Sequence, residues 1–124
     1  SGLMGTAEDY QVFLQTVLNG GQFDDVTLFG DEAAAWLTEN QIGSLRLRDD
    51  AFTYGFSLTM TEGNRVNNRL PGRLNWSGLF QTFFWIDTAR NSTAVFMTQV
   101  YPSQHRDELY NQFEQLVNSS YLQN

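Results

Sequence analysis

The run Phe83-Phe84-Trp85-Ile86 constrains the fold of this chain more than any other segment. Four large apolar side chains follow one another without a polar residue, although successive side chains of a β-strand point to opposite faces of its sheet. A strand that is apolar on both faces is stable only where both faces are covered. The run therefore predicts a central strand in a layered fold.

The composition fits one small domain of this kind. The chain has 124 residues, of which 41% are hydrophobic, so we expect residues 1–124 to form a single domain with a packed core. The net charge is −7 and all seven basic residues are scattered arginines, which argues against nucleic-acid binding. No apolar run approaches the roughly 20 residues of a membrane helix. We expect a soluble chain, which would be periplasmic or secreted if its parent protein carries a signal peptide.

Missing residue types limit the chemistry that this chain can perform alone. It contains no cysteine, no lysine and only one histidine, His105, so disulfides, thiolate metal sites and histidine-clustered metal sites are excluded and no metal or cofactor is expected. We expect His105 to be solvent-exposed at the start of the last helix. The pairs Asp24-Asp25 and Asp49-Asp50 are expected in solvated turns. We therefore assign no catalytic residue within this chain.

Two helices are predicted in the N-terminal third. Thr6, with Asp9 three residues later, is typical of a helix start, and Gly20-Gly21 is typical of a helix end. Between them runs an apolar stripe at helical spacing, formed by Tyr10, Phe13, Leu14, Val17 and Leu18. A second, shorter helix begins at Gly30-Asp31 and ends near residues 40–43, with Ala33, Trp36 and Leu37 on its inner face.

Three antiparallel strands and a helix are predicted after residue 50. The strand segments are 52–60, 74–86 with an interruption near residue 78, and 92–100, separated by turns at Glu62-Gly63-Asn64 and at 87–91. A final helix follows Pro102, over about Ser103 to Leu122, with Leu109, Phe113, Leu116 and Val117 as its apolar stripe. The expected fold is therefore α+β: two N-terminal helices, a three-stranded antiparallel sheet and a C-terminal helix packed on the sheet.

Short motifs along the chain resemble those of a known family in the same order. Residues 1–10, SGLMGTAEDY, resemble a G-G-L-x-S-T-A-x-D-Y helix entry, and residues 18–21 an L-N-G-G continuation. Residues 54–56 resemble a G-L-G-F strand, residues 83–87 an F-W-I-D-P motif and residues 96–99 an F-x-T-Q motif. Together they resemble the C-terminal part of the serine β-lactamase and penicillin-binding-protein-like superfamily, in particular its class C-like hydrolases and esterases.

This resemblance implies a substrate-binding role for four consecutive residues. Trp76-Ser77-Gly78 stands where the family has its Lys-Thr-Gly strand motif. The resemblance implies that the Ser77 hydroxyl contacts the substrate, that Gly78 lets the substrate lie close to the strand, and that the Leu79 N–H is an oxyanion donor. Trp76 replaces the lysine, and the loss of that cation favours neutral esters or amides over β-lactams. Without the resemblance, Trp76 would be a packing residue and Ser77-Gly78 an irregularity in a strand.

Two hypotheses for function follow. The S-x-x-K nucleophile motif and the tyrosine motif of the family lie upstream of every motif matched here, so the resemblance implies the C-terminal segment of a larger serine hydrolase, inactive alone, whose partner is the upstream part of the same protein. The alternative is a non-catalytic binding or self-association module. It rests on the expectation that the last helix covers only one face of strand 83–86, which would leave the other sheet face exposed.

Overall fold

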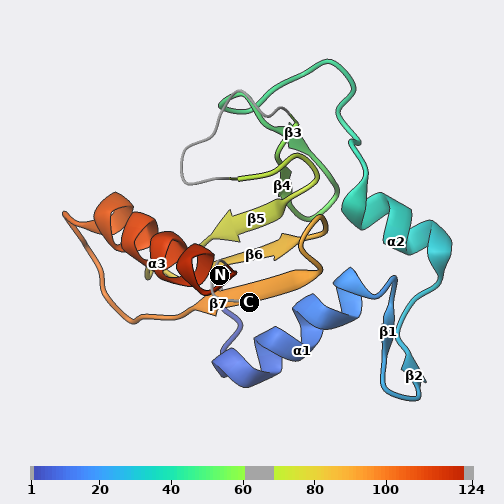
Figure 1. Cartoon of the computed structure of the whole chain (residues 1–124), viewed down its shortest axis with the longest axis horizontal. Helices are drawn as coiled ribbons and strands as arrows, with labels where there is room; N and C mark the ends of the chain where they lie inside the picture. The colour runs from blue at the N-terminus through green and yellow to red at the C-terminus, as the bar shows by residue number, and fades with distance from the viewer. Residues whose placement is uncertain (1, 61–68, 122–124) are drawn as a thin grey trace.

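In the computed structural model, which describes residues 2–60 and 69–121, helices pack on both faces of a five-stranded antiparallel sheet (Figure 1). The helices are α1 (Ala7–Leu18), α2 (Asp31–Thr38) and α3 (Arg106–Tyr121). The strands of the main sheet are β3 (Ala51–Phe52), β4 (Ser57–Leu58), β5 (Leu74–Ser77), β6 (Phe83–Asp87) and β7 (Ser92–Phe96). A separate hairpin of β1 (Gln22–Phe23) and β2 (Val26–Thr27) lies between α1 and α2. The predicted α+β class is confirmed.

The number of strands differs from the prediction. The sheet order is β3-β4-β5-β6-β7, with every neighbouring pair antiparallel. Segment 52–60 is a hairpin and not one strand, because the Thr53 hydroxyl accepts the backbone N–H groups of Gly55 and Phe56 at 3.1 and 2.9 Å and folds the chain back. Segment 74–86 likewise divides into two strands at Gly78. The turn expected at Glu62-Gly63-Asn64 lies outside the described residues.

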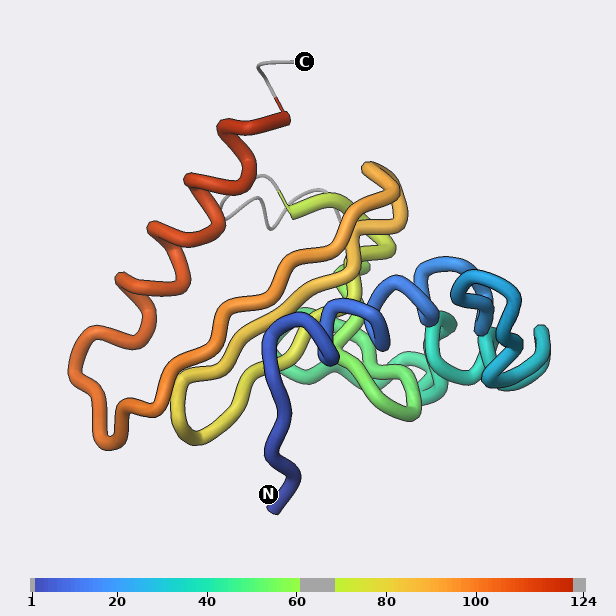
Figure 2. The backbone as a smooth tube through the Cα atoms, turned by 90° about the horizontal axis from the view of Figure 1, so that it is seen from below, coloured from blue at the N-terminus to red at the C-terminus, as the bar shows by residue number. Residues whose placement is uncertain are grey.

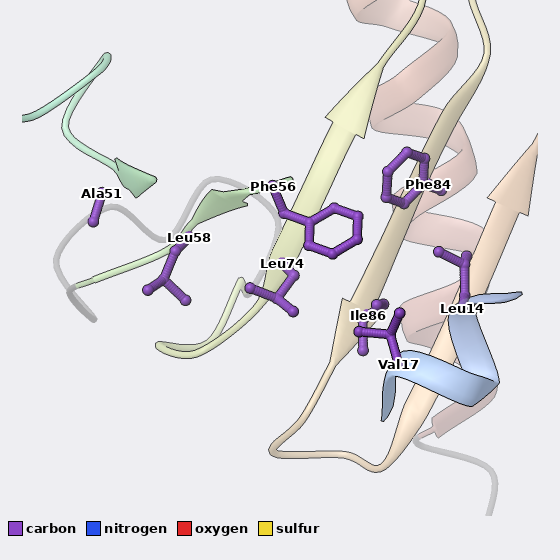
Figure 3. Close-up of a cluster of buried hydrophobic side chains, with 8 residues drawn as sticks. All are labelled: Leu14, Val17, Ala51, Phe56, Leu58, Leu74, Phe84 and Ile86. Carbon is purple, nitrogen blue, oxygen red and sulfur yellow. The ribbon is translucent and has the colours of Figure 1, made fainter. Parts of the chain in front are cut away.

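Helix α1 forms where its sequence signals predicted it and covers one face of the sheet. Thr6 is its N-cap, and its side chain accepts the Asp9 N–H at 3.1 Å. Leu14 and Val17 are fully buried against apolar side chains of β5 and β6 (Figure 3). The helix ends before Gly21, which has φ +103° and lies so close to Phe29 that a Cβ would be 2.1 Å from the Phe29 carbonyl oxygen.

Helix α3 covers the opposite face of the same sheet. Figure 2 shows α3 on one side of the strands and α1 on the other. Phe83 and Trp85 are buried on the α3 side, and the Phe83 ring stacks on Tyr110 with centroids 4.5 Å apart. All five residues of β6 are consequently buried. The prediction of a strand covered on both faces is confirmed. The prediction that one face of this strand would be exposed is wrong, because α1 covers the face that α3 does not.

Two helix faces also differ from the prediction. In α2, Trp36 is 46% exposed and its ring meets Tyr54 edge-on, whereas Ala33 and Leu37 are partly buried. In α3, Phe113 and Val117 pack on the sheet as predicted, but Leu116 is 71% exposed and the most buried residues are Tyr110 and Glu114. In the described part of the chain, no helix is both long and apolar enough to cross a membrane.

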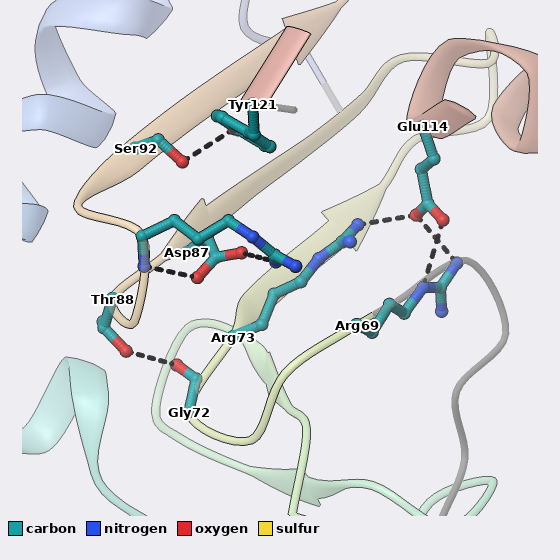
Figure 4. A network of polar contacts seen from close by, with 9 residues as sticks. Arg69, Gly72, Arg73, Asp87, Thr88, Ser92, Glu114 and Tyr121 are labelled. Carbon is teal, nitrogen blue, oxygen red and sulfur yellow. Dashed lines mark hydrogen bonds and ion pairs between the residues drawn. The ribbon is translucent and has the colours of Figure 1, made fainter. Parts of the chain in front are cut away.

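Glu114 points inward because two arginines meet it there (Figure 4). Arg73 Nη2 lies 2.6 Å from Glu114 Oε1, and Arg69 Nη2 lies 2.9 Å from the same oxygen. The Arg73 guanidinium also lies over the Trp85 ring, 4.4 Å from its centroid. Burial lowers the pKa of Arg73, and the charge of Glu114 opposes that shift. A charged cluster thus joins α3 to the sheet and fixes which face of the helix points inward.

Candidate active-site wall

The four predicted substrate-binding residues lie at the end of β5 and in the turn that follows. Strand β4 pairs with β5 only at Leu58↔Leu74 and Ser57↔Asn75. Beyond Asn75, no strand in residues 2–60 or 69–121 pairs with this edge of β5, while β6 continues along the other edge. Among the described residues, the end of β5 at Trp76 and Ser77 is therefore an unpaired sheet edge, a position where an extended ligand has access to backbone groups.

Trp76 and Ser77 point to opposite faces of the sheet. Trp76 is paired with Phe84, whose side chain belongs to the core under α1, and Ser77 is paired with Phe83, which packs under α3. The Trp76 ring meets Phe52 edge-on with centroids 5.2 Å apart and remains 45% exposed. The structure therefore brings the predicted residues to one strand end but distributes their side chains over two faces.

Gly78 opens a three-residue hairpin loop between β5 and β6. The Gly78 N–H donates to the Thr82 carbonyl at 2.9 Å, and the Gly78 carbonyl accepts the Gln81 N–H at 3.2 Å. Gln81 has φ +64°, the left-handed conformation that such a loop needs at its last position. A Cβ on Gly78 would lie 2.3 Å from Thr82 Oγ1. A side chain at this position would displace the Thr82 hydroxyl, so the local packing favours glycine whether or not a substrate lies nearby.

Leu79 and the residue after it form the tip of this loop. The side chains of Leu79 and Phe80 are 59% and 43% exposed. The tip is held from the segment after β7, because Thr98 Oγ1 donates to the Phe80 carbonyl at 2.6 Å and Gln81 Nε2 donates to the Val100 carbonyl at 3.1 Å. Side-chain hydrogen bonds to the segment after β7 therefore hold the Leu79 loop in place, in addition to its own backbone turn.

The structure adds one residue that sequence reasoning missed. Arg106, the first residue of α3, donates from Nη2 to Ser77 Oγ at 2.8 Å and to the Gly78 carbonyl at 3.0 Å. The preference for neutral substrates rested on the missing lysine, yet a cation lies against Ser77 from another element. No local signal at Arg106 indicates this contact, because it depends on how α3 crosses β5 and β6.

The other chemically interesting residues lie where the sequence predicted. The His105 side chain is 74% exposed, with Nδ1 3.4 Å from Glu108 Oε2. Asp24, Asp25 and Asp49 are exposed, and Asp50 accepts the Ser57 hydroxyl at 2.9 Å. Across residues 2–60 and 69–121, no three side chains of the metal-binding types are grouped to hold an ion. The described contacts of Ser77 include no histidine or carboxylate that could serve as its base.

Comparison with known proteins identifies the family. A layered α+β fold with an open strand end that carries Ser-Gly is compatible with a hydrolase wall, and the family model described as Beta-lactamase matches residues 1–118. The chain therefore belongs to the β-lactamase family. This family is part of the serine β-lactamase and penicillin-binding-protein-like superfamily. The resemblance found in the sequence motifs is confirmed.

One relative among curated proteins supports the same assignment. The chain is 29% identical over 106 residues to the "Putative D-alanyl-D-alanine carboxypeptidase" of Escherichia coli (strain K12). The match covers 79% of this chain and 22% of that protein. The chain thus spans about a fifth of the length of the relative it matches.

Proposed function

We propose that this chain forms one wall of the active site of a β-lactamase-like serine hydrolase that cleaves esters or amides, including β-lactam amides. In this proposal Ser77 contacts the substrate, Gly78 and the open edge of β5 admit it, and the Leu79 N–H donates to the oxyanion. The nucleophile and its base come from another part of the protein, upstream of the matched motifs. The 124-residue chain is inactive alone.

The observation that carries this proposal is the family match over residues 1–118 together with the open strand end at Trp76-Ser77-Gly78. Acyl transfer needs a nucleophile activated by an adjacent base. This sequence contains no lysine, and its one histidine is an exposed residue paired with Glu108. The chain therefore offers groups that bind and stabilise, and an activated serine has to be provided from elsewhere.

The first experiment compares the 124-residue chain with the full-length protein that contains it. Both are assayed with chromogenic esters, with nitrocefin and with a peptide that ends in D-alanyl-D-alanine, which the name of the E. coli relative suggests. We expect turnover by the full-length protein and none by the 124-residue chain above a denatured control. Turnover by the short chain that persists through repurification would refute the proposal that it lacks a nucleophile.

The second experiment tests Ser77 in the full-length protein. Ser77→Ala removes one hydrogen bond to substrate and is expected to lower kcat/KM by about threefold to tenfold. Ser119→Ala is the matched control, because Ser119 lies on the exposed surface of α3 and bonds only to the Leu116 carbonyl in the described contacts. Equal kcat/KM for Ser77→Ala and wild type would exclude Ser77 from the site.

A further inference from the structure

We propose that Arg106 is a positioning residue that fixes the direction in which Ser77 donates its proton, and that it acts on substrate through Ser77 and not by direct contact. This inference rests on the proposed function, because it concerns how the wall containing Ser77 recognises an ester or amide. It is carried by the contacts that join the start of α3 to the end of β5.

The Arg106 contact determines which way the Ser77 hydroxyl is used. A guanidinium has only donors, so Ser77 Oγ must accept the hydrogen bond of 2.8 Å from Arg106 Nη2. The hydroxyl proton of Ser77 cannot be given back to Arg106 and points elsewhere. The Ser77 proton is therefore available to a ligand, and we infer that the ligand atom opposite it is an acceptor such as a carbonyl or carboxylate oxygen.

The same contact ties the hydroxyl to the backbone of the loop. Arg106 Nη2 also donates to the Gly78 carbonyl at 3.0 Å, so one nitrogen bridges the Ser77 side chain and the first residue of the turn. A charged donor makes a stronger hydrogen bond than a neutral one and polarises the group that accepts it. The Ser77 hydroxyl is thus both oriented and made a better donor.

Arg106 itself is held by a second chain of hydrogen bonds. Arg106 Nε donates to the Tyr110 hydroxyl at 3.3 Å, and Tyr110 donates in turn to the Thr82 carbonyl at 3.0 Å. Gly78 and Thr82 are the two ends of the hairpin loop, so Arg106 and Tyr110 of α3 contact both ends. In the described part of the chain no carboxylate forms an ion pair with Arg106, and its described acceptors are the Ser77 hydroxyl, the Gly78 carbonyl and the Tyr110 hydroxyl.

A double-mutant cycle in the full-length protein tests whether Arg106 acts through Ser77. The variants are Ser77→Ala, Arg106→Gln and the double variant, with Arg46→Gln as a control that removes the same charge from an exposed position. We expect Arg106→Gln to lower kcat/KM by about threefold to tenfold, and to cause no further loss in the Ser77→Ala background. Additive losses in kcat/KM would show that Arg106 acts independently of Ser77 and would overturn the inference.

A second cycle measures the contact without any reaction. The denaturation midpoint is compared, in the absence of ligand, for wild type, Ser77→Ala, Arg106→Gln and the double variant. The decrease in midpoint of the double variant is expected to be smaller than the sum of the decreases of the two single variants. Arg106→Lys keeps the charge but not the forked geometry, so it should restore kcat/KM only in part and should not help when Ser77 is absent.

The outcomes separate the inference from the proposed function. If Ser77→Ala leaves kcat/KM unchanged while the ligand-free cycle shows coupling, the proposed substrate contact of Ser77 fails. The contact between Arg106 and Ser77 is then purely structural, and the recognition role of Arg106 is overturned. If Ser77→Ala lowers kcat/KM and the Arg106→Gln loss is additive in both cycles, the proposed function stands and only the positioning role fails. Non-additive losses in both cycles support it.

Discussion

The two faces of the central sheet are built from different chemistry. Under α1, the core is a cluster of buried hydrophobic side chains: Leu14, Val17, Ala51, Phe56, Leu58, Leu74, Phe84 and Ile86. The polar residue that α1 itself buries, Thr16, is uncharged. Under α3, the aromatic residues Phe83, Trp85 and Tyr110 surround the buried charges of Arg73 and Glu114. Apolar burial is non-directional, whereas a buried ion pair stabilises only one geometry. The α1 face therefore stabilises the fold through apolar burial. The α3 face determines the position of α3, the helix that begins with Arg106.

The largest effect is expected from breaking the charged cluster on the α3 face. Glu114→Leu leaves Arg73 almost fully buried without its closest counter-charge. The expected loss is about 3–5 kcal/mol in the free energy of unfolding, measured by urea denaturation of the full-length protein. The control is the double variant Arg73→Met with Glu114→Leu, which also removes the buried guanidinium; Arg69, which loses the same partner, is 27% exposed and has access to water. The double variant should recover most of the loss, and an unchanged deficit in it would mean that the pair itself is not the source.

A cavity under α1 is the matching test of the apolar face. Leu14 is fully buried, so Leu14→Ala is expected to cost about 2–5 kcal/mol through lost transfer energy and the cavity left behind. Val12→Ala on the exposed side of α1 is the control, with a change of less than about 0.5 kcal/mol in the same denaturation assay. A comparable loss in both variants would contradict the proposed role of the buried stripe.

The smallest effect is a pH dependence that distinguishes the α1 face. Tyr10 packs on the Phe84 ring with centroids 5.1 Å apart, and burial raises its pKa above the usual 10.0. The folded state prefers the neutral phenol, so this contribution is complete below pH 10 and is lost as pH rises from 10 through the raised pKa. The stability difference between wild type and Tyr10→Phe should be constant below about pH 9 and should shift against wild type above pH 10. A difference that stays flat to higher pH would remove Tyr10 as the cause.

Local signals predicted the elements that depend on neighbouring residues in sequence. The N-cap at Thr6, the helix that follows it and the doubly covered strand at residues 83–86 were all predicted correctly, because capping and side-chain periodicity are short-range properties. The strand count was wrong, because the hairpin turns at Thr53 and Gly78 interrupt segments whose apolar pattern continues on both sides. Periodicity alone does not distinguish one long strand from two paired ones.

The candidate site was predicted only in part for a related reason. Motif resemblance identified Trp76-Ser77-Gly78-Leu79 as candidate site residues. It did not predict that the Trp76 and Ser77 side chains lie on opposite faces of the sheet, or that Arg106 contacts Ser77. Ser77 and Arg106 are separated by 29 residues, and their contact depends on the crossing of α3 over the sheet. That crossing depends in turn on Glu114 facing inward, where a helical apolar pattern would have placed Leu116.

The sequence by itself determined the α+β class, the first helix, the central buried strand and membership of the β-lactamase family. These properties follow from side-chain periodicity, capping and short motifs, which act over a few residues. Only the tertiary structure decided that α1 covers the second face, that the sheet has five strands, and that Arg106 lies against Ser77. Each of these depends on contacts between segments far apart in the chain, and their free energies exist only once the layers have packed together.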